Sequence, residues 1–328
     1  MLRSTCGIRC RIILRSAFGI FVFAAASNAG NALAQASIEP RGFGSVSLSF
    51  LAINHSGPIL TDGTLDSVYP GTSVNRDIDF EVNYGVTDRL TLSAGIPFVS
   101  SKYTDPGGPP PGSKLNSVDE CRCWNSGFQD FRFKARYNVT GHPHSALLIT
   151  PSVFVGVPSH AYEYQGEAVF GRRLKELQLG MDVRRRIDAI SQNFYIQGNY
   201  TYAFVERVLD IPNNRSNAKW GGVFLLTERL SLEGRLTWQH SHGGLRAGSP
   251  TSATLPSPGD FTTQETRDQL DRLLRDNYLR TGIGVNYSLQ RMNLFADFSG
   301  FIAGSDTHRI RALALGVNIP FQLRRFSE

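Results

Sequence analysis

The chain has 328 residues and a formal net charge of +6, from 34 Lys and Arg against 28 Asp and Glu. Gly (32), Phe (21) and Tyr (11) are frequent beside only 3 Met, a composition that favours twisted sheet with aromatic packing over helix. The mean hydropathy of −0.19 argues against a bundle of membrane helices, but it is compatible with membrane strands that alternate apolar and polar residues.

The first 34 residues have the features of a secretory signal peptide. Four arginines precede a short apolar run at residues 17–26, and small residues follow the run. The run is too short to cross a bilayer as a helix, which takes roughly 20 apolar residues, and no later stretch approaches that length. We predict cleavage after Ala34 or Ala36, with residues 1–34 as the signal peptide and residues 35–328 as the mature protein.

Removing the signal peptide removes four arginines and no acid, so the formal charge falls to 6 − 4 = +2. This argues against nucleic acid as a partner. Cys6 and Cys10 leave with the signal peptide, and Cys121 and Cys123 remain. These two could form a local disulfide or stay as thiols, but they do not supply the ligands of a structural zinc site. We expect no metal and no cofactor.

From Gly42 onward, apolar and polar residues alternate with a period of two. The runs match the roughly 9 to 11 residues with which a tilted strand crosses the hydrocarbon layer. We count twelve strands, at residues 42–54, 74–86, 90–103, 127–139, 144–158, 174–187, 193–206, 217–226, 230–241, 277–288, 292–303 and 309–323. The sequence therefore predicts an all-β fold, a transmembrane antiparallel up-and-down β-barrel of about 12 strands.

The connections between these strands alternate in length. Residues 86–89, 140–143, 227–229 and 289–291 are tight turns. The connections 55–73, 104–126, 159–173, 207–216 and 242–276 are long, and 304–308 is the one brief member of this set. Short periplasmic turns and long external loops are typical of outer-membrane barrels, so we expect both termini in the periplasm and the protein in the cell outer membrane.

One stretch of the last long loop, residues 261–276, has helical character. Thr262 or Thr263 could cap it, and Leu270, Leu273 and Leu274 form a partial apolar stripe. The sequence predicts a short helix here. It could act as a plug or lid at the external mouth, or it could be a surface helix that shortens the loop.

The two faces of the predicted strands differ in polarity, as where Ile78 and Phe80 alternate with Asp79. Because this pattern repeats around twelve strands behind a signal peptide, we expect the apolar face toward lipid and the charged face toward the lumen. Buried charge is costly unless it is paired or hydrated, so the lumen charges either form complementary ladders that stiffen and partly fill the barrel or line a hydrated path whose walls set selectivity. Twelve strands enclose less room than porins of roughly 16 to 18, which favours a narrow, selective pore. The candidate lumen and selectivity residues are Asp77, Asp79, Glu81, Asp130, Arg132, Lys134, Arg136, Asp182, Arg184, Arg186, Glu233, Arg235 and Arg280, with Asp297 further round.

An outer-membrane enzyme, a lipid hydrolase or a protease, is the main alternative. A hydrolase needs a Ser beside a His base on the outer wall, and the candidates are Asn54-His55-Ser56 and His240-Ser241-His242. Adjacent residues of a strand point to opposite faces, which disfavours both. For a protease, Asp306 and His308 are close in sequence, but no second pair of acids accompanies them. We therefore predict no enzyme and no catalytic residues.

Two segments resemble strands of the outer-membrane phenol meta-pathway degradation-like transporter family. Residues 87–98 (TDRLTLSAGIPF) match its T-D-R-L-x-L-x-x-G-x-P strand, and residues 127–137 (GFQDFRFKARY) match its G-x-x-D-x-R-x-x-x-R-Y strand. This chain has Phe128-Gln129 where the family often has a small residue followed by Gly. The resemblance implies passage of small, often aromatic or hydrophobic, compounds, and it points to Asp130, Arg132 and Arg136 as functional lumen residues.

The sequence thus predicts a channel or transporter with a small-molecule substrate, outer-membrane lipid around it and the barrel-assembly machinery as its partner during insertion. A diffusion channel leads. A transporter that releases hydrophobic compounds laterally would need an opening in the wall, for which Pro97 and Pro151 are the visible hints. An enzyme or a structural barrel without transport is the remaining alternative.

Overall fold

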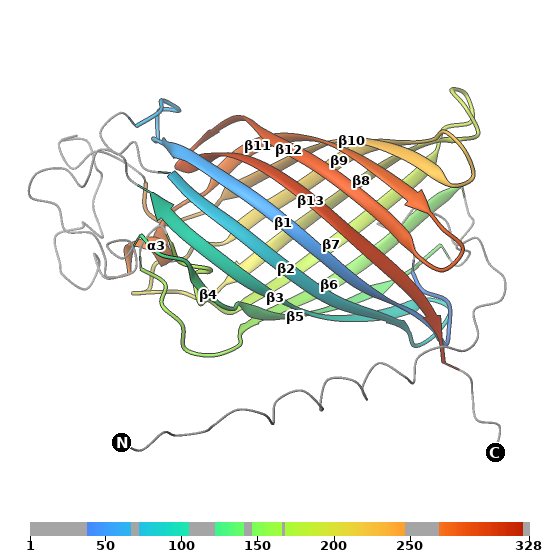
Figure 1. Ribbon diagram of the computed structural model, residues 1–328, viewed down its shortest axis with the longest axis horizontal. Helices are drawn as coiled ribbons and strands as arrows, with labels where there is room; N and C mark the ends of the chain where they lie inside the picture. Colours follow the sequence, from blue (N-terminus) through green and yellow to red (C-terminus); the bar gives the residue numbers. More distant parts are fainter. Residues whose placement is uncertain are drawn as a thin grey trace, which may run out of the picture.

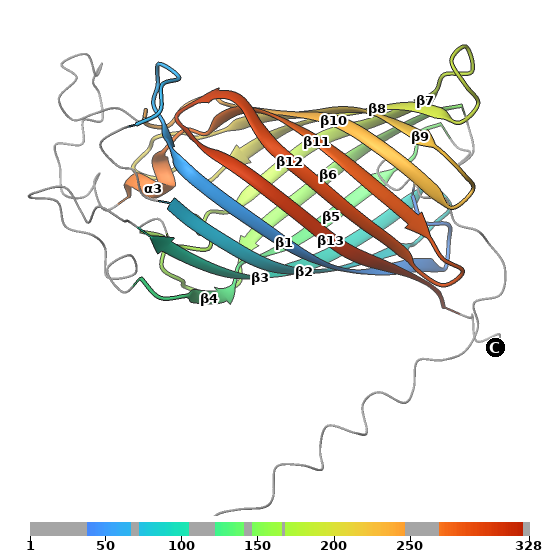
Figure 2. The ribbon, with the colours of Figure 1, turned by 45° about the horizontal axis from the view of Figure 1, so that its top comes forward.

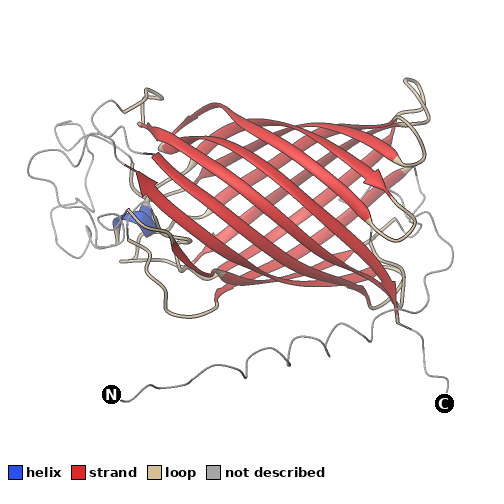
Figure 3. Ribbon diagram, in the orientation of Figure 1, coloured by secondary structure: helices blue, strands red, loops and turns tan. Residues whose placement is uncertain are grey.

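The computed structural model describes residues 38–66, 72–104, 122–140, 146–165, 168–246 and 269–323. These residues form an elongated barrel of tilted strands and one short helix (Figures 1 and 3). The elements are β1 (Phe43–Ile59), β2 (Thr72–Gly85), β3 (Leu90–Thr104), β4 (Asn125–Phe128), β5 (Asp130–Tyr137), β6 (Leu147–Pro158), β7 (Glu176–Arg186), β8 (Phe194–Val205), β9 (Arg215–Leu225), β10 (Leu230–Ser241), α3 (Leu270–Leu273), β11 (Asn277–Ser288), β12 (Asn293–Ser305) and β13 (Thr307–Gln322).

The sheet is antiparallel throughout and closes on itself. β1 pairs with β2 on one side and with β13 on the other, from Phe43 opposite Gln322 to Ile59 opposite Thr307. β4 and β5 both pair with β3, so the 13 labelled strands make 13 − 1 = 12 positions around the barrel. Figure 2 shows the same closed wall from a second direction. The predicted all-β, up-and-down barrel of about twelve strands is confirmed.

The strand predicted over 127–139 is interrupted at Gln129. Between the pairs Phe98 opposite Phe128 and Gly95 opposite Arg132, β3 has two residues and the facing chain has three, which is a β-bulge. Pro97 lies at this point of β3 and has no N–H to donate, although its carbonyl accepts from the N–H of Gln129 at 2.9 Å. The extra residue shifts the alternation, so Phe128 and Phe131 both face outward.

The outer wall is apolar and the inner wall is polar, as the alternation predicts. Phe80 of β2, Phe133 of β5 and Leu179 of β7 are 44, 48 and 47% exposed on the outside, whereas Asp182 of β7 is only 6% exposed inside. A water-soluble protein would bury such side chains, but in a bilayer they contact acyl chains and are already in an apolar medium.

Two of the short connections are built in the same way. Thr87 precedes β3 and Thr227 precedes β10, and each hydroxyl oxygen accepts a hydrogen bond from the N–H three residues later, at 2.9 and 3.0 Å. This side-chain bond stabilises a tight reversal of the chain. The repeated Thr-x-Arg-Leu sequence therefore fixes two turns at the same end of the barrel.

In the described part of the predicted helical stretch, residues 269–276, the helix ends at Leu273. α3 is a single turn over residues 270–273, while Thr262 and Thr263 lie outside the described residues. Leu273 is 1% exposed and packs in a cluster with Leu174, Val205 and Val208, which explains why this turn is ordered. Within the described part of the chain, no helix is long and apolar enough to cross a membrane.

The open question about the cysteines is answered for one of them. Cys123 is part of a disulfide. Cys121 lies outside the described residues.

The two faces of β1 allow a direct test of the wall assignment. Leu48 is 47% exposed on the outside, and the next residue, Ser49, faces the lumen with Asp79 of β2 opposite it. We expect Leu48→Arg to lower the free energy of unfolding by about 2–4 kcal/mol, because it places a charge in the hydrocarbon layer. Ser49→Arg should lower the free energy of unfolding much less, because its charge lies in a polar lumen beside a carboxylate. Urea titration of the protein refolded in liposomes measures both, and equal losses would contradict the assignment.

Candidate functional site

The interior of the barrel contains a cavity of about 510 Å³. Its walls come from β5, β7, β8, β9 and β10, and every lining side chain is polar or charged. Four are cationic and two are anionic, which leaves the lining with a formal charge of 4 − 2 = +2. The lining residues are Lys134, Arg136, Glu176, Gln178, Asp182, Asn199, Thr201, Arg215, Asn217, Lys219 and Gln239.

Three predicted lumen residues, Lys134, Arg136 and Asp182, line this cavity together. The prediction missed Arg215 and Lys219, both on β9. Their strand was expected to begin at residue 217, which left Arg215 in a loop. The polar series Arg215, Asn217, Lys219 has the same period of two as the chosen strands, and this signal could have found both residues.

The charged groups of the cavity are only partly neutralised. Arg215 Nη2 lies 2.9 Å from Glu176 Oε2, and Asn199 donates to Asp182 Oδ1 at 2.8 Å. Lys219 Nζ is 3.9 Å from Glu233 Oε1, at the limit of an ion pair. Lys134 forms no hydrogen bond or ion pair with any of the described residues. The cavity therefore presents ammonium groups whose donors are available to water or to a solute.

Besides Arg215 and Glu176, which join β9 to β7 across β8, two further ion pairs join strands that are not neighbours. Arg132 of β5 pairs with Asp79 of β2, and the side chain crosses β3 at Gly95. Arg235 of β10 pairs through two nitrogens with Asp297 of β12 and crosses β11.

The intervening strand has no side chain where these arginines cross. A Cβ atom on Gly282 of β11 would lie 3.1 Å from Cζ of Arg235. Glycine at such positions leaves the space that a guanidinium needs to pass over the neighbouring strand and reach the strand beyond it. The two pairs thus stiffen the wall over three strands each, and they neutralise charges that burial would otherwise penalise.

The remaining predicted acids lie near β2 and the external part of β5. Glu81 Oε1 accepts a hydrogen bond from Asn83 at 3.0 Å. Asp130 accepts one from the hydroxyl of Tyr162 in the loop between β6 and β7. Asp77 is largely enclosed, and its Oδ1 has no hydrogen-bond partner among the described residues. These carboxylates lie on β2 and β5, so they adjoin the cations Lys134 and Arg136 of β5.

The remaining predicted cations lie away from the cavity. Arg184 is 6% exposed with its guanidinium 5.5 Å from the ring centre of Tyr195. Arg280 lies 3.5 Å over the ring of Tyr278. Arg186 pairs with Asp188 at 2.7 Å in the short connection after β7, so it belongs to the periplasmic mouth.

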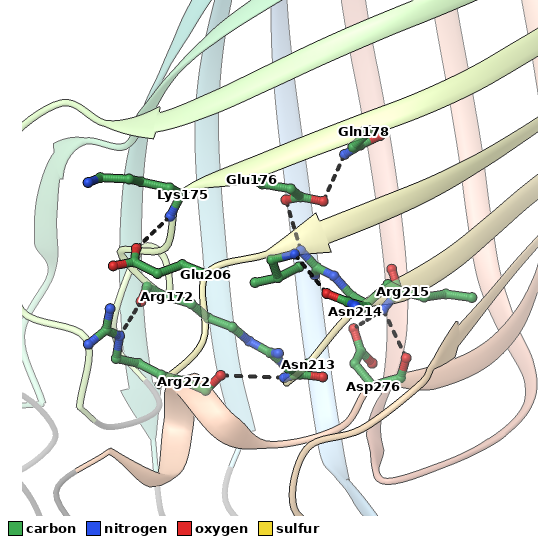
Figure 4. A network of polar contacts seen from close by, with 12 residues as sticks. Arg172, Lys175, Glu176, Gln178, Glu206, Asn213, Asn214, Arg215, Arg272 and Asp276 are labelled. Atoms are coloured by element: carbon green, nitrogen blue, oxygen red, sulfur yellow. Dashed lines mark hydrogen bonds and ion pairs between the residues drawn. The ribbon is translucent and has the colours of Figure 1, made fainter. Parts of the chain in front are cut away.

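At the external end, α3 is held by contacts to two other loops (Figure 4). Arg272 donates to the carbonyls of Arg172 and Arg173 at 3.2 and 3.0 Å, and its guanidinium lies 4.9 Å from the ring centre of Tyr164. Asn213, before β9, donates to the carbonyl of Leu274 at 3.0 Å. Arg172 donates to the same carbonyl at 2.9 Å, and burial lowers the pKa of its guanidinium. The helix is thereby fixed beside the external ends of β7, β8 and β9.

The motifs that suggested a hydrolase make other contacts. Ser56 donates to the carbonyl of Arg309 at 3.2 Å, and the ring of His55 lies 5.8 Å from that of His308. Asp306, which forms the tight turn between β12 and β13, accepts from Thr61 at 2.6 Å.

His242 Nε2 is 2.7 Å from the hydroxyl of Ser216, which also contacts the hydroxyl of Tyr200. Among the described residues, no carboxylate is hydrogen-bonded to this histidine. The described residues also contain no group of three or more His, Cys, Asp or Glu side chains that could hold a metal ion.

A closed antiparallel barrel with an apolar outside, a charged inside and short turns at one end is an outer-membrane β-barrel. An outer-membrane channel from Pseudomonas putida F1 has the same fold, with a TM-score of 0.64 and 13% identity over 88% of this chain and 98% of that one. At 13% identity, this likeness shows the fold alone.

Two weaker likenesses carry no further argument. The NanC porin has a TM-score of 0.44 and 6% identity over 84% of this chain and 98% of that one. The β domain of the Bordetella autotransporter BrkA has a TM-score of 0.46 and 12% identity over 85% of this chain and 100% of that one. No protein-family model matches the chain, and no curated protein matches it in sequence.

The Arg235 and Asp297 pair is suited to a double-mutant cycle. We expect Asp297→Asn to lower the free energy of unfolding by about 1–3 kcal/mol, because it leaves a partly buried guanidinium without its anion. Arg235→Gln should have a similar effect, and the double variant should lose less than the sum. Urea titration in liposomes measures all three variants, and strictly additive losses would show that the two side chains do not interact.

The anchoring of α3 is tested by proteolysis. Arg272→Ala removes two hydrogen bonds to carbonyls and the contact with Tyr164, so the segment should open more often. We expect trypsin to cleave after Arg275 about tenfold faster, the factor that corresponds to about 1.4 kcal/mol of opening free energy. The same substitution at Arg207, which is exposed in the loop after β8, is the control and should leave the rate unchanged.

Proposed function

We propose that this protein is an outer-membrane channel through which small, polar organic solutes diffuse, with a preference for anions. The observation that carries the proposal is the cavity lined only by polar and charged side chains with an excess of cations. A solute that enters it exchanges its water shell for hydrogen bonds to these groups. This is how charged side chains set selectivity in channels.

The polar lining bears on the kind of compound that passes. No side chain of the cavity wall is aromatic or aliphatic. A neutral hydrocarbon forms no hydrogen bonds with these side chains, so its transfer from lipid into the cavity would not lower its free energy. Aromatic compounds, to which the family resemblance points, would be recognised here in a carboxylated form.

The continuity of the wall favours passage along the lumen over lateral release. At Pro151 the pairing of β6 with β7 continues without a shift, with Met181 opposite the proline and Gly180 opposite Ser152. At Pro97 the ladder contains the bulge at Gln129, but pairing resumes on both sides of it. The two prolines therefore supply no gap for a lateral exit.

The remaining expectations fit this proposal. Residues 1–34 direct export as a signal peptide, and the barrel-assembly machinery inserts the mature chain. Strand β13 keeps outward apolar residues, Leu313, Leu315 and Ile319, over most of its length, as a lipid-facing final strand requires.

Single-channel recording of the refolded mature protein in planar bilayers tests the proposal. We expect conductance steps and, across a KCl gradient, a reversal potential that shows preference for chloride. Lys134→Glu reverses one cationic charge of the cavity and should lower the anion preference severalfold. Arg291→Glu, in the exposed turn before β12, is the charge-matched control and should leave the preference unchanged. Repeated absence of conductance, or equal effects of the two variants on the anion preference, would contradict the proposal.

A second recording addresses the solute. Sodium benzoate on one side should interrupt the current in brief blocks, since its carboxylate can pair with Lys134 and Lys219 while it crosses the cavity. Benzamide, its neutral counterpart of similar size, should produce no blocks. Blocks of equal frequency with both would show that charge does not govern entry.

A further inference from the structure

The outer wall carries one group of basic side chains that the channel does not use. They are Arg76 of β2, Lys102 of β3, and Arg309 and Arg311 of β13, and together they are called the rim patch here. All four belong to the outward-facing series of their strands. They lie toward the external ends of four adjacent strands, β13, β1, β2 and β3 (Figures 1 and 2).

Strand register places the members of the patch in one region of the wall, four strands wide. Arg311 is opposite Asn54 of β1, Asn54 is opposite Val74 of β2, and Val74 is opposite Lys102 of β3. This one row across four strands therefore begins and ends with a cation. Arg76 and Arg309 are each two residues from a member of this row along their strands, so they extend the patch on either side of it.

Among the described residues, no acid pairs with the cations of the patch. Arg309 and Arg311 are exposed, Arg76 and Lys102 are half-buried, and none of the four forms an ion pair with an acid of the described residues. The outward side chains nearest to them are uncharged, as Asn54, Ser56 and Ser100 illustrate. Four like charges in one region of the wall create a positive potential that attracts anions.

The position of the patch identifies the kind of anion. Toward the middle of the barrel, the outward series of each of the four strands becomes apolar within one or two outward positions, with Leu313 on β13, Phe50 on β1, Ile78 on β2 and, past Ser100, Phe98 on β3, all at least 38% exposed. These side chains contact acyl chains. The cations above them then lie at the depth of the lipid headgroups of the outer leaflet, where phosphate groups are found.

We propose that the rim patch is a binding site for a phosphorylated lipid of the outer leaflet, whose phosphate groups pair with Arg76, Lys102, Arg309 and Arg311 while its acyl chains lie along the apolar wall below. Guanidinium groups pair with phosphate through two parallel hydrogen bonds, which suits three of the four members. The bound lipid would seal the β1 and β13 seam from outside. The inference requires the barrel to span a membrane, but it is independent of conductance.

Native mass spectrometry of the mature protein in detergent, titrated with lipid A, tests this site. The test variant is R76Q/K102Q/R309Q/R311Q. The matched control is R41Q/R89Q/R229Q/R291Q, which removes four exposed cations near the short turns at the opposite end. We expect the wild type and the control to retain the lipid, and the test variant to bind it at least about tenfold more weakly.

Two further measurements show whether the phosphate groups, the acyl chains or both are needed for binding. Dephosphorylated lipid A should bind the wild type as weakly as the test variant does, and inorganic phosphate at the same concentration should not displace the lipid. Equal binding of lipid A by test and control variants, or of the dephosphorylated lipid by the wild type, would overturn the proposal, as would displacement by inorganic phosphate. The β-sheet signal in far-UV circular dichroism of each variant serves as the folding check. If the quadruple test variant does not fold, the pair R309Q/R311Q against R89Q/R291Q makes the same comparison, with a smaller expected loss.

Discussion

The hydrogen-bonded seam between β1 and β13 is the interaction on which the rest of the structure depends. Lipid offers no partner to backbone N–H and C=O groups, and each unpaired group costs several kcal/mol, so an open sheet edge cannot persist in a bilayer. Pairing from Phe43 opposite Gln322 to Ile59 opposite Thr307 removes both edges. Once the sheet is closed, each residue faces either lipid or the lumen, and the period of two along the chain becomes a separation of apolar and polar surfaces.

The charged side chains of the interior are distributed unevenly around the barrel. Ion pairs and cavity-lining charges are concentrated on β2, β5, β7, β9, β10 and β12, whereas β1 and β13 present small residues such as Ser47, Ser49 and Ala312 to the lumen. Glycines and small residues between the charged strands let arginines reach across a neighbouring strand. The same guanidinium and carboxylate groups thus stiffen the wall and give the lumen its polarity. The polar lumen and the stiffness of the narrow barrel are consequences of one arrangement.

The two sides of the external end differ in what covers them. Beside β7, β8 and β9, α3 is packed on Leu174 and Val205 and held by Arg272 and Asn213, so the protein itself covers that side. On β13, β1, β2 and β3, the outward surface carries the cations of the rim patch above the apolar belt. The proposed solute site in the lumen and the proposed lipid site therefore lie on different parts of one wall.

The sequence by itself determined the strand number, the strand positions to within a few residues and the face of each charged side chain, because alternation is local and lipid penalises any departure from it. The twelve predicted strands, the outward Phe80 and the inward Asp182 are examples. Only the tertiary structure decided which charges meet. Arg235 reaches Asp297 and Arg215 reaches Glu176 because register aligns strands far apart in sequence with a small residue between them. The bulge at Gln129 and the packing of Leu273 likewise depend on such neighbours, which no local pattern encodes.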